Sequence, residues 1–176
     1  MLVTIIIPVY NEKNLIARLL KQVIDSDTSP FLKEIIIVDD GSTDGTGDIL
    51  KEYASNNIKL ISHSKNLGKA SAINSALRVA TGDVIIIQDA DLEYSPQDYK
   101  RLLNPFSDEN TKVVYGSRFL LKTWPTNMKA ANWLANKLFT FLINLLYKTH
   151  ITDEGTAYKL FRKDIIKSID INKIIC

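Results

Sequence analysis

The sequence predicts an α/β fold in which helices cover both faces of a mostly parallel, doubly wound sheet. Apolar, β-branched runs alternate with stretches of helical periodicity through the first two thirds of the chain, as is typical of this fold class. The apolar runs lack polar alternation, as expected for strands that are buried on both faces. With 176 residues, 45% of them hydrophobic and 24% charged, the chain is long enough for one core and is expected to be a single domain.

The strands and helices can be placed one after another along the chain. The run from Val3 to Ile7 is apolar and is closed by Pro8, and a helical pattern follows from about Asn14 to Asp25. The cap-then-proline pair Ser95-Pro96 predicts the start of a short helix. Further strands are expected at Glu34–Val38, Ile58–Ser62, Val84–Ile87 and Lys112–Tyr115, and further helices at 46–55, 70–80 and 130–147. Right-handed crossovers between these strands give a Rossmann-like sheet.

Polar side chains gather where the predicted strands end. Ligands of doubly wound sheets bind beyond the carboxyl ends of the strands, so these side chains are expected to converge on one edge. They are Glu12, Asp39, Asp40, Asn66, Lys69, Asp89, Asp91 and Glu93. This edge carries more acid than stability alone would require, which indicates a ligand site.

The acids after the fourth predicted strand are the centre of this site. In extended backbone Asp89 and Asp91 point the same way, and Glu93 continues the line. At about 4 Å and an effective dielectric near 20, each pair repels by about 4 kcal/mol. A hard divalent ion such as Mg²⁺ relieves that repulsion and shares such ligands with substrate phosphates. The alternative is a solvated acidic turn at the end of a strand.

The sequence does not match the glycine-rich motifs of dinucleotide-binding proteins or of P-loop proteins. The turn after the first strand has no glycine, Gly45-Thr46-Gly47 lacks the third glycine of a dinucleotide site, and Gly68-Lys69 lacks the remainder of a P-loop.

The segment from Ala130 to Tyr147 is predicted to be an apolar helix with one narrow polar stripe. Asn132, Asn136, Thr140 and Asn144 recur every four residues on it. These interruptions argue against a membrane span and favour a helix that lies in the bilayer surface. The stretch from 110 to 152 contains basic residues and no acid, which suits an anionic surface. A helix buried in the core or in an oligomer interface is the alternative.

Cysteine and histidine contribute little to the site. The sole cysteine is Cys176, which excludes an intrachain disulfide and indicates a reducing, cytoplasmic compartment. His63 and His150 are isolated and are expected to be surface or packing residues.

Five motifs follow one another in the order and spacing of one enzyme family. They are Pro8-Val9-Tyr10-Asn11-Glu12, Asp39-Asp40-Gly41-Ser42-Thr43-Asp44, Asn66-Leu67-Gly68-Lys69, Asp89-Ala90-Asp91-Leu92-Glu93 and Gly116-Ser117-Arg118. In these motifs the chain resembles family-two glycosyltransferases with the GT-A fold. More narrowly, it resembles the branch that contains dolichol-phosphate mannosyltransferase and bacterial polyprenyl-phosphate glycosyltransferases.

The resemblance implies an inverting transfer of sugar from a GDP- or UDP-linked donor to a lipid phosphate, with Mg²⁺ or Mn²⁺. It implies that Asp89 and Asp91 hold the metal, with Glu93 as a further ligand where relatives often have Gln, and that Arg118 meets a phosphate. The implied substrate-binding residues are Pro8, Tyr10, Glu12 and Asp39 at the base and ribose, Asp40 beside them, Lys69 near the nucleotide, and Asp153 and Lys159 near the acceptor.

The resemblance also implies that two parts of the chain bind different substrates. Residues 1–118 would bind the nucleotide sugar, and residues 119–176 would face the acceptor and the cytoplasmic side of a membrane. Relatives usually continue beyond the point that corresponds to Cys176, so we expect the acceptor part to be truncated. No nucleic-acid partner is expected. Two other functions stay open, namely transfer to a saccharide hydroxyl of a surface polysaccharide and nucleotide binding without turnover.

Overall fold

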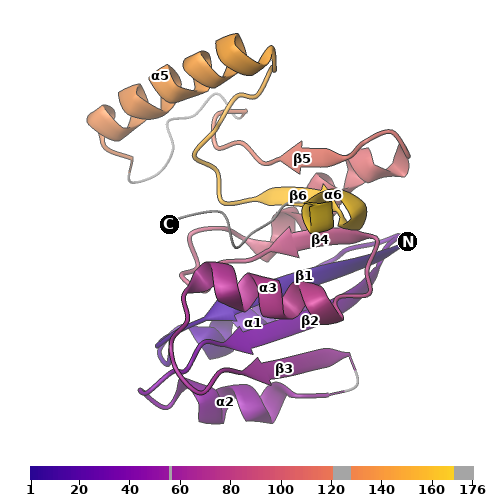
Figure 1. The fold of residues 1–176 in the computed structure, drawn as a ribbon, viewed down its shortest axis with the longest axis vertical. Coiled ribbons are helices and arrows are strands. Elements are labelled where there is room, and N and C mark those ends of the chain that lie inside the picture. Colours follow the sequence, from indigo (N-terminus) through magenta and orange to yellow (C-terminus); the bar gives the residue numbers. More distant parts are fainter. Residues whose placement is uncertain (56, 121–127, 169–176) are drawn as a thin grey trace.

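The computed structural model describes residues 1–55, 57–120 and 128–168, and these form a six-stranded sheet in the order β3-β2-β1-β4-β6-β5 (Figure 1). The strands are β1 (Leu2–Val9), β2 (Leu32–Asp39), β3 (Ile58–Ser62), β4 (Val84–Ile87), β5 (Val113–Tyr115) and β6 (Lys159–Arg162). The first four pair in parallel, whereas β6 runs antiparallel to both β4 and β5. The doubly wound, mostly parallel sheet is therefore confirmed.

Helices cover both faces of this sheet. Alternate residues of each strand point to opposite faces, so Ile37 faces one helical layer and Ile36 the other. One layer holds α1 (Ile16–Asp25), α2 (Thr46–Tyr53), α4 (Tyr99–Leu103) and the flanking turns η1 (Pro96–Asp98) and η2 (Asn104–Ser107). The other holds α3 (Lys69–Val79) and α6 (Lys163–Ser168). Because both faces are covered, the buried strand positions are mostly apolar, with Thr4 and Glu34 as polar exceptions.

Strand β6 is the main difference from the expected topology. Its four residues enter the sheet between β4 and β5, with Ile86 opposite Leu160 and Val114 opposite the same leucine. The segment is too short for its alternation to separate a strand from a turn. As a result, the chain after Asp153 returns to the carboxyl edge of β4 before it enters the sheet.

Helix α5 (Ala130–Tyr147) lies apart from the two layers, at one end of the molecule (Figure 1). Within this helix the buried residues are polar, Asn136 and Thr140. Its large apolar side chains are exposed, among them Leu134, Leu138, Phe139, Phe141, Leu142, Leu145, Leu146 and Tyr147. The alternative of a helix buried in the core is therefore wrong. In the described part of the chain, no helix combines the length and hydropathy needed to cross a bilayer.

Candidate functional site

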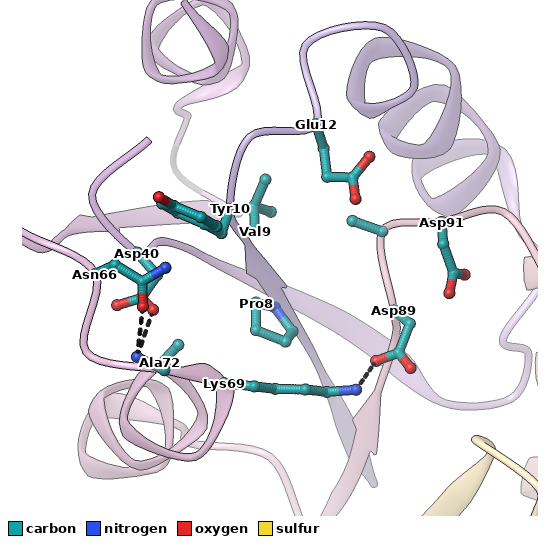
Figure 2. A pocket seen from close by; sticks show the side chains of 12 residues that line it. Pro8, Val9, Tyr10, Glu12, Asp40, Asn66, Lys69, Ala72, Asp89 and Asp91 are labelled. Carbon is teal, nitrogen blue, oxygen red and sulfur yellow. Dashed lines mark hydrogen bonds and ion pairs between the residues drawn. The ribbon is translucent and has the colours of Figure 1, made fainter. Parts of the chain in front are cut away.

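A cleft of about 330 Å³ opens at the carboxyl edge of β1, β2 and β4, beside the first turn of α3 (Figure 2). Four chain segments that are far apart in the sequence meet here, as the positions of the strand ends predicted. Its lining residues are Pro8, Val9, Tyr10, Glu12, Asp40, Asn66, Gly68, Lys69, Ala72, Asp89, Ala90 and Asp91. The edge is thus hollow and acidic, with one ammonium group among the lining side chains.

Lys69 crosses the cleft from α3 to the turn after β4 (Figure 2). Its Nζ lies 2.5 Å from Oδ1 of Asp89, and more than half of the lysine side chain is exposed. As the first residue of α3, Lys69 also lies where the N–H groups of the helix point outward and attract anions. The lysine therefore neutralises one acid of the cleft while remaining accessible to a negatively charged ligand.

Glu12 and Asp91 line the cleft from two neighbouring turns, after β1 and after β4 (Figure 2). Partial burial, and then the negative charges of Asp91 and Asp44, raise the pKa of the Glu12 carboxyl. Burial is the larger cause, and the two neighbouring carboxylates add to it. Oxygen ligands in this arrangement suit a hard divalent cation, which commonly takes one or two carboxylates and completes its shell with phosphate oxygens. Asp89 and Asp91 both line the cleft and offer carboxylate oxygens of this kind.

The expected third ligand, Glu93, does not join this pair. Strand β4 ends at Ile87, and Leu92 has a φ of 61°, so the backbone from 89 to 93 turns instead of staying extended. The amide of Glu93 donates to Oδ1 of Asp91, at 3.0 Å. Among the described residues, no three acids, histidines or cysteines lie close enough to hold an ion together. The alternation assumed from the sequence fails because the strand stops two residues before Asp89.

Asp40, and not Asp39, lines the cleft. Asp39 points to the opposite face of the sheet, where its carboxylate accepts the amide of Ser42 at 3.0 Å. Asp40 accepts the amides of Leu67 and Gly68 at 3.0 and 2.8 Å, so it holds the loop before Lys69 against the cleft. The reason is the two-residue period of β2, which sends neighbouring side chains to opposite faces. Asp39 is therefore not among the residues that line the cleft, and its contact with a base or ribose stays a prediction.

His63 supports the same loop. Its Nδ1 lies 2.6 Å from Asp40 Oδ1, and its Nε2 lies 2.9 Å from the hydroxyl of Ser75 on α3. The loop is also pressed against the turn after β2, because a Cβ at Gly41 would lie 2.5 Å from the Lys65 carbonyl carbon. His63 is a packing residue, as expected, and His150 is exposed.

Arg118 and Asp153 lie outside the lining of the cleft and bind each other. The Asp153 carboxylate, 1% exposed, accepts from Nε and Nη2 of Arg118 at 2.8 and 2.9 Å and from its backbone amide at 3.0 Å. Although burial opposes it, this pairing lowers the pKa of Asp153. Arg118 also feels the charge of Glu93, which lies just after the acidic turn. A two-bond pair of this kind fixes the plane of the guanidinium.

Lys159 lies at the start of β6, opposite Tyr115, with its Nζ 5.5 Å from the centre of that ring. This end of β6 is at the carboxyl edge of β4, and Lys159 is outside the lining of the cleft.

Comparison with known proteins identifies the family. Residues 4–170 match the family described as Glycosyl transferase family 2. The chain belongs to this family. A dolichol-phosphate mannosyltransferase of Pyrococcus furiosus is 28% identical over 99% of this chain and 50% of its own length. An undecaprenyl-phosphate 4-deoxy-4-formamido-L-arabinose transferase of Edwardsiella ictaluri is 29% identical over 95% of this chain and 51% of its own length. The chain spans about half the length of these curated relatives.

Solved structures place the family 2 chain in the GT-A fold. A mannosyltransferase from Pyrobaculum calidifontis, in complex with GDP-mannose and Mn²⁺, superposes with a TM-score of 0.71 at 26% identity, over 96% of this chain and 46% of that one. A glucosyl-3-phosphoglycerate synthase from Mycobacterium tuberculosis gives the same TM-score at 17% identity, over 96% of this chain and 58% of that one, which supports the fold alone.

The residues that support the acidic turn could not be predicted from the sequence. Gln88 is fully buried, and its Oε1 accepts the hydroxyls of Tyr99 and Tyr158 at 2.6 and 2.7 Å. Its Nε2 donates to the carbonyl of Asp89 at 2.9 Å. This arrangement joins β4, α4 and the segment before β6 directly beneath Asp89. The available signal was a polar residue that ends an otherwise apolar strand.

Proposed function

We propose that this chain is the catalytic part of an inverting, metal-dependent glycosyltransferase that moves a sugar from a nucleoside-diphosphate sugar to a polyprenyl phosphate, dolichyl or undecaprenyl. The observation that carries the proposal is the cleft in which Lys69 and the carboxylates of Asp89 and Asp91 meet at the edge of the sheet (Figure 2). The names of the curated relatives, which include transferases acting on dolichol phosphate and undecaprenyl phosphate, support this acceptor class.

The donor half of the proposal concerns residues 1–118. Pro8 and the half-exposed ring of Tyr10 form the wall on which a base and ribose pack, with Glu12 beside them. Mg²⁺ or Mn²⁺ held by Asp89 and Asp91 supplies positive charge next to the departing diphosphate. Lys69 binds the same diphosphate by exchanging its partner Asp89 for a phosphate oxygen. These cations stabilise the charge that grows as the bond to the sugar breaks.

The acceptor half concerns residues 119–176, together with Arg118. A phosphate oxygen of the lipid attacks the anomeric carbon, and the electron pair of the broken bond leaves with the diphosphate, so the configuration inverts. A phosphate monoester is ionised near neutral pH, since its second pKa is about 6. The reaction therefore needs no general base. Arg118, whose side chain is 31% exposed, binds the acceptor phosphate, with Asp153 as its partner and Lys159 farther along the same edge.

The membrane is the proposed partner of α5, at its cytoplasmic face. The exposed apolar side chains of this helix and the flanking Lys129 and Lys148 suit the headgroup region of an anionic bilayer. Replacing Leu138, Leu142 and Leu145 by Glu should reduce sedimentation with phosphatidylglycerol vesicles at least tenfold. The matched control replaces three exposed, uncharged residues outside α5, Ala17, Gln97 and Asn104, by Glu, so that both variants gain three negative charges. Equal vesicle binding by both triple variants would contradict the membrane contact.

The experiment that tests the activity is a panel of GDP- and UDP-sugars, offered with detergent-solubilised polyprenyl phosphate and with Mg²⁺ or Mn²⁺. We expect one donor to give a lipid-linked sugar together with free nucleoside diphosphate, and chelation of the metal to stop both. Transfer to an oligosaccharide but not to the lipid would favour the saccharide-hydroxyl alternative, which needs a carboxylate base. Metal-assisted nucleotide binding with no release of diphosphate would identify a binding domain without turnover.

A further inference from the structure

We infer that Asn136 of α5 is a positioning residue that connects the membrane-facing helix to Arg118. It does so by holding the Asp153 carboxylate that fixes the guanidinium. This inference rests on the proposed function, because it assigns α5 a second task beyond contact with the bilayer.

The first observation is that the burial of α5 is the reverse of that in an ordinary surface helix. Asn136 and Thr140 are 9% and 6% exposed, whereas Leu134 and Leu145 are each 64% exposed. An ordinary surface helix buries its apolar stripe and exposes its polar one. Here the polar stripe is the contact with the rest of the chain, so hydrogen bonds and not apolar packing determine where the helix lies.

The second observation is a continuous chain of hydrogen bonds from α5 to Arg118. Asn136 Nδ2 donates to Asp153 Oδ1 at 2.9 Å, and the same oxygen accepts from Nη2 of Arg118 at 2.9 Å. On the other side, the hydroxyl of Thr140 lies 3.4 Å from Asn136 Oδ1 and accepts the amide of Glu154 at 3.1 Å. The Asn136 amide is therefore held in one orientation, with its donor toward the carboxylate.

One turn farther along the stripe, Asn144 binds the same segment of chain. Its Oδ1 accepts the amide of Ile151 at 3.0 Å, and its Nδ2 donates to the carbonyl of Ile151 at 2.8 Å. These two hydrogen bonds from one side-chain amide fix the position of α5 along the 149–154 segment. A shift of the helix would have to break it, and would move Asn136 away from Asp153 at the same time.

Two close contacts reinforce the link. Lys137 Nζ of α5 lies 4.1 Å from the centre of the Phe119 ring, which follows Arg118 directly. A Cβ at Gly155 would lie 2.7 Å from Asn136 Nδ2 and 3.2 Å from Arg118 Nη2. A side chain at position 155 would therefore have to displace the ends of both of these side chains, which approach the same turn from α5 and from Arg118.

The consequence is that contact of α5 with a bilayer influences the orientation of the Arg118 guanidinium. Arg118 is close enough to Glu93, which follows the acidic turn, to interact with its charge. If Asn136 is lost, Asp153 keeps the bonds from Arg118 but not the bond that orients its own carboxylate. The guanidinium then samples other orientations, and an acceptor phosphate binds more weakly while the donor cleft is unchanged.

The test compares Asn136→Leu with Asn132→Leu, which makes the same change one turn earlier at an exposed position of the stripe. Transfer is measured with polyprenyl phosphate in phosphatidylglycerol vesicles. For Asn136→Leu we expect a rise of about tenfold in KM for the lipid, as for the loss of one charge-assisted hydrogen bond. KM for the nucleotide sugar and vesicle sedimentation should equal those of the wild type. Asn132→Leu should match the wild type throughout, and Asn136→Gln, which keeps the amide, should recover part of the loss.

A second measurement does not depend on turnover. Solvent exchange of the Arg118 Nε–H, followed by NMR, should be faster in Asn136→Leu and unchanged in Asn132→Leu. If Asn136→Leu does not fold, Asn136→Ala, which removes the donor without adding bulk or charge, takes its place in both measurements. Equal exchange rates and equal lipid KM would overturn the inference. A wild type that moves no sugar to lipid, but in which the exchange rates differ as stated, would overturn the proposed function alone.

Discussion

Glu34 offers the sharpest test of how the sheet is held together at the edge opposite the cleft. Its carboxylate accepts hydrogen bonds from the Thr4 hydroxyl at 2.5 Å, from the Thr81 amide and hydroxyl at 2.9 and 2.8 Å, and from Lys59 Nζ at 2.7 Å. One buried group thus joins β1, β2, β3 and the turn before β4. Replacing it by Gln removes the charge but keeps the size.

The magnitude follows from the pKa of this carboxyl. Burial by itself would raise the pKa, but the hydrogen bonds from Lys59, Thr4 and Thr81 together outweigh it and lower the pKa from 4.5 to about 2. A lowering of the pKa by about 2.5 corresponds to about 3.5 kcal/mol, since one pKa unit is about 1.4 kcal/mol. Lys59 is 44% exposed, so solvent screening reduces the expected contribution to about 2 kcal/mol. For a domain of this size, Tm should then fall by about 5 °C.

The pH dependence has a definite sign. Because the pKa is lowered on folding, the contribution is fully present above pH 4.5 and is lost as the pH falls toward 2. Urea unfolding followed by circular dichroism should show Glu34→Gln about 2 kcal/mol less stable at pH 7, with the difference shrinking between pH 4.5 and 2. Glu52→Gln, at an exposed glutamate of α2, is the control and should match the wild type. A Glu34→Gln variant as stable as this control at pH 7 would refute the reasoning.

Three further predictions concern the cleft. Asp91→Asn should lower Mn²⁺-assisted affinity for a nucleotide sugar at least tenfold in calorimetry and leave the melting curve unchanged, because the side chain is exposed; equal affinity would remove the metal from this pair. Asp40→Ala should cost about 1–3 kcal/mol, since two loop amides lose their acceptor, and should speed their hydrogen exchange; unchanged exchange would count against the loop-holding role. Glu12→Gln should stabilise the fold at pH 8 and not at pH 4 in thermal melts, because the raised pKa makes the charged form costly as the pH rises through it; the opposite pH trend would contradict the crowding of charge.

Local pattern was sufficient for most of the sheet and for the location of the site. The β-branched runs at β1, β2 and β4 could be placed because a continuous apolar run of this length is typical of a strand that helices cover on both faces. The convergence of Lys69, Asp89 and Asp91 followed in turn, because parallel strands bring their carboxyl ends to one edge. Family membership, predicted from five motifs, is confirmed over residues 4–170.

The arrangement of individual side chains depended on contacts that the sequence does not display. The two-residue period of a strand decides whether Asp39 or Asp40 reaches the cleft, and a shift of one residue in the assumed register exchanges them. The positive φ of Leu92 turns Glu93 away from the pair of acids, although an extended chain would have aligned all three. The directions of these side chains therefore depend on the residue at which each strand ends in the folded sheet.

What the sequence by itself determined is the order of strands and helices, the edge at which the ligand site forms, and the family. What only the tertiary structure decided is which distant groups pair. Strand β6 enters between β4 and β5, Gln88 meets two tyrosines, and Asp153 binds both Arg118 and Asn136 across 35 and 17 residues. The physical reason is that periodicity reports which face of an element is apolar, whereas a long-range hydrogen bond depends on where that face finally lies.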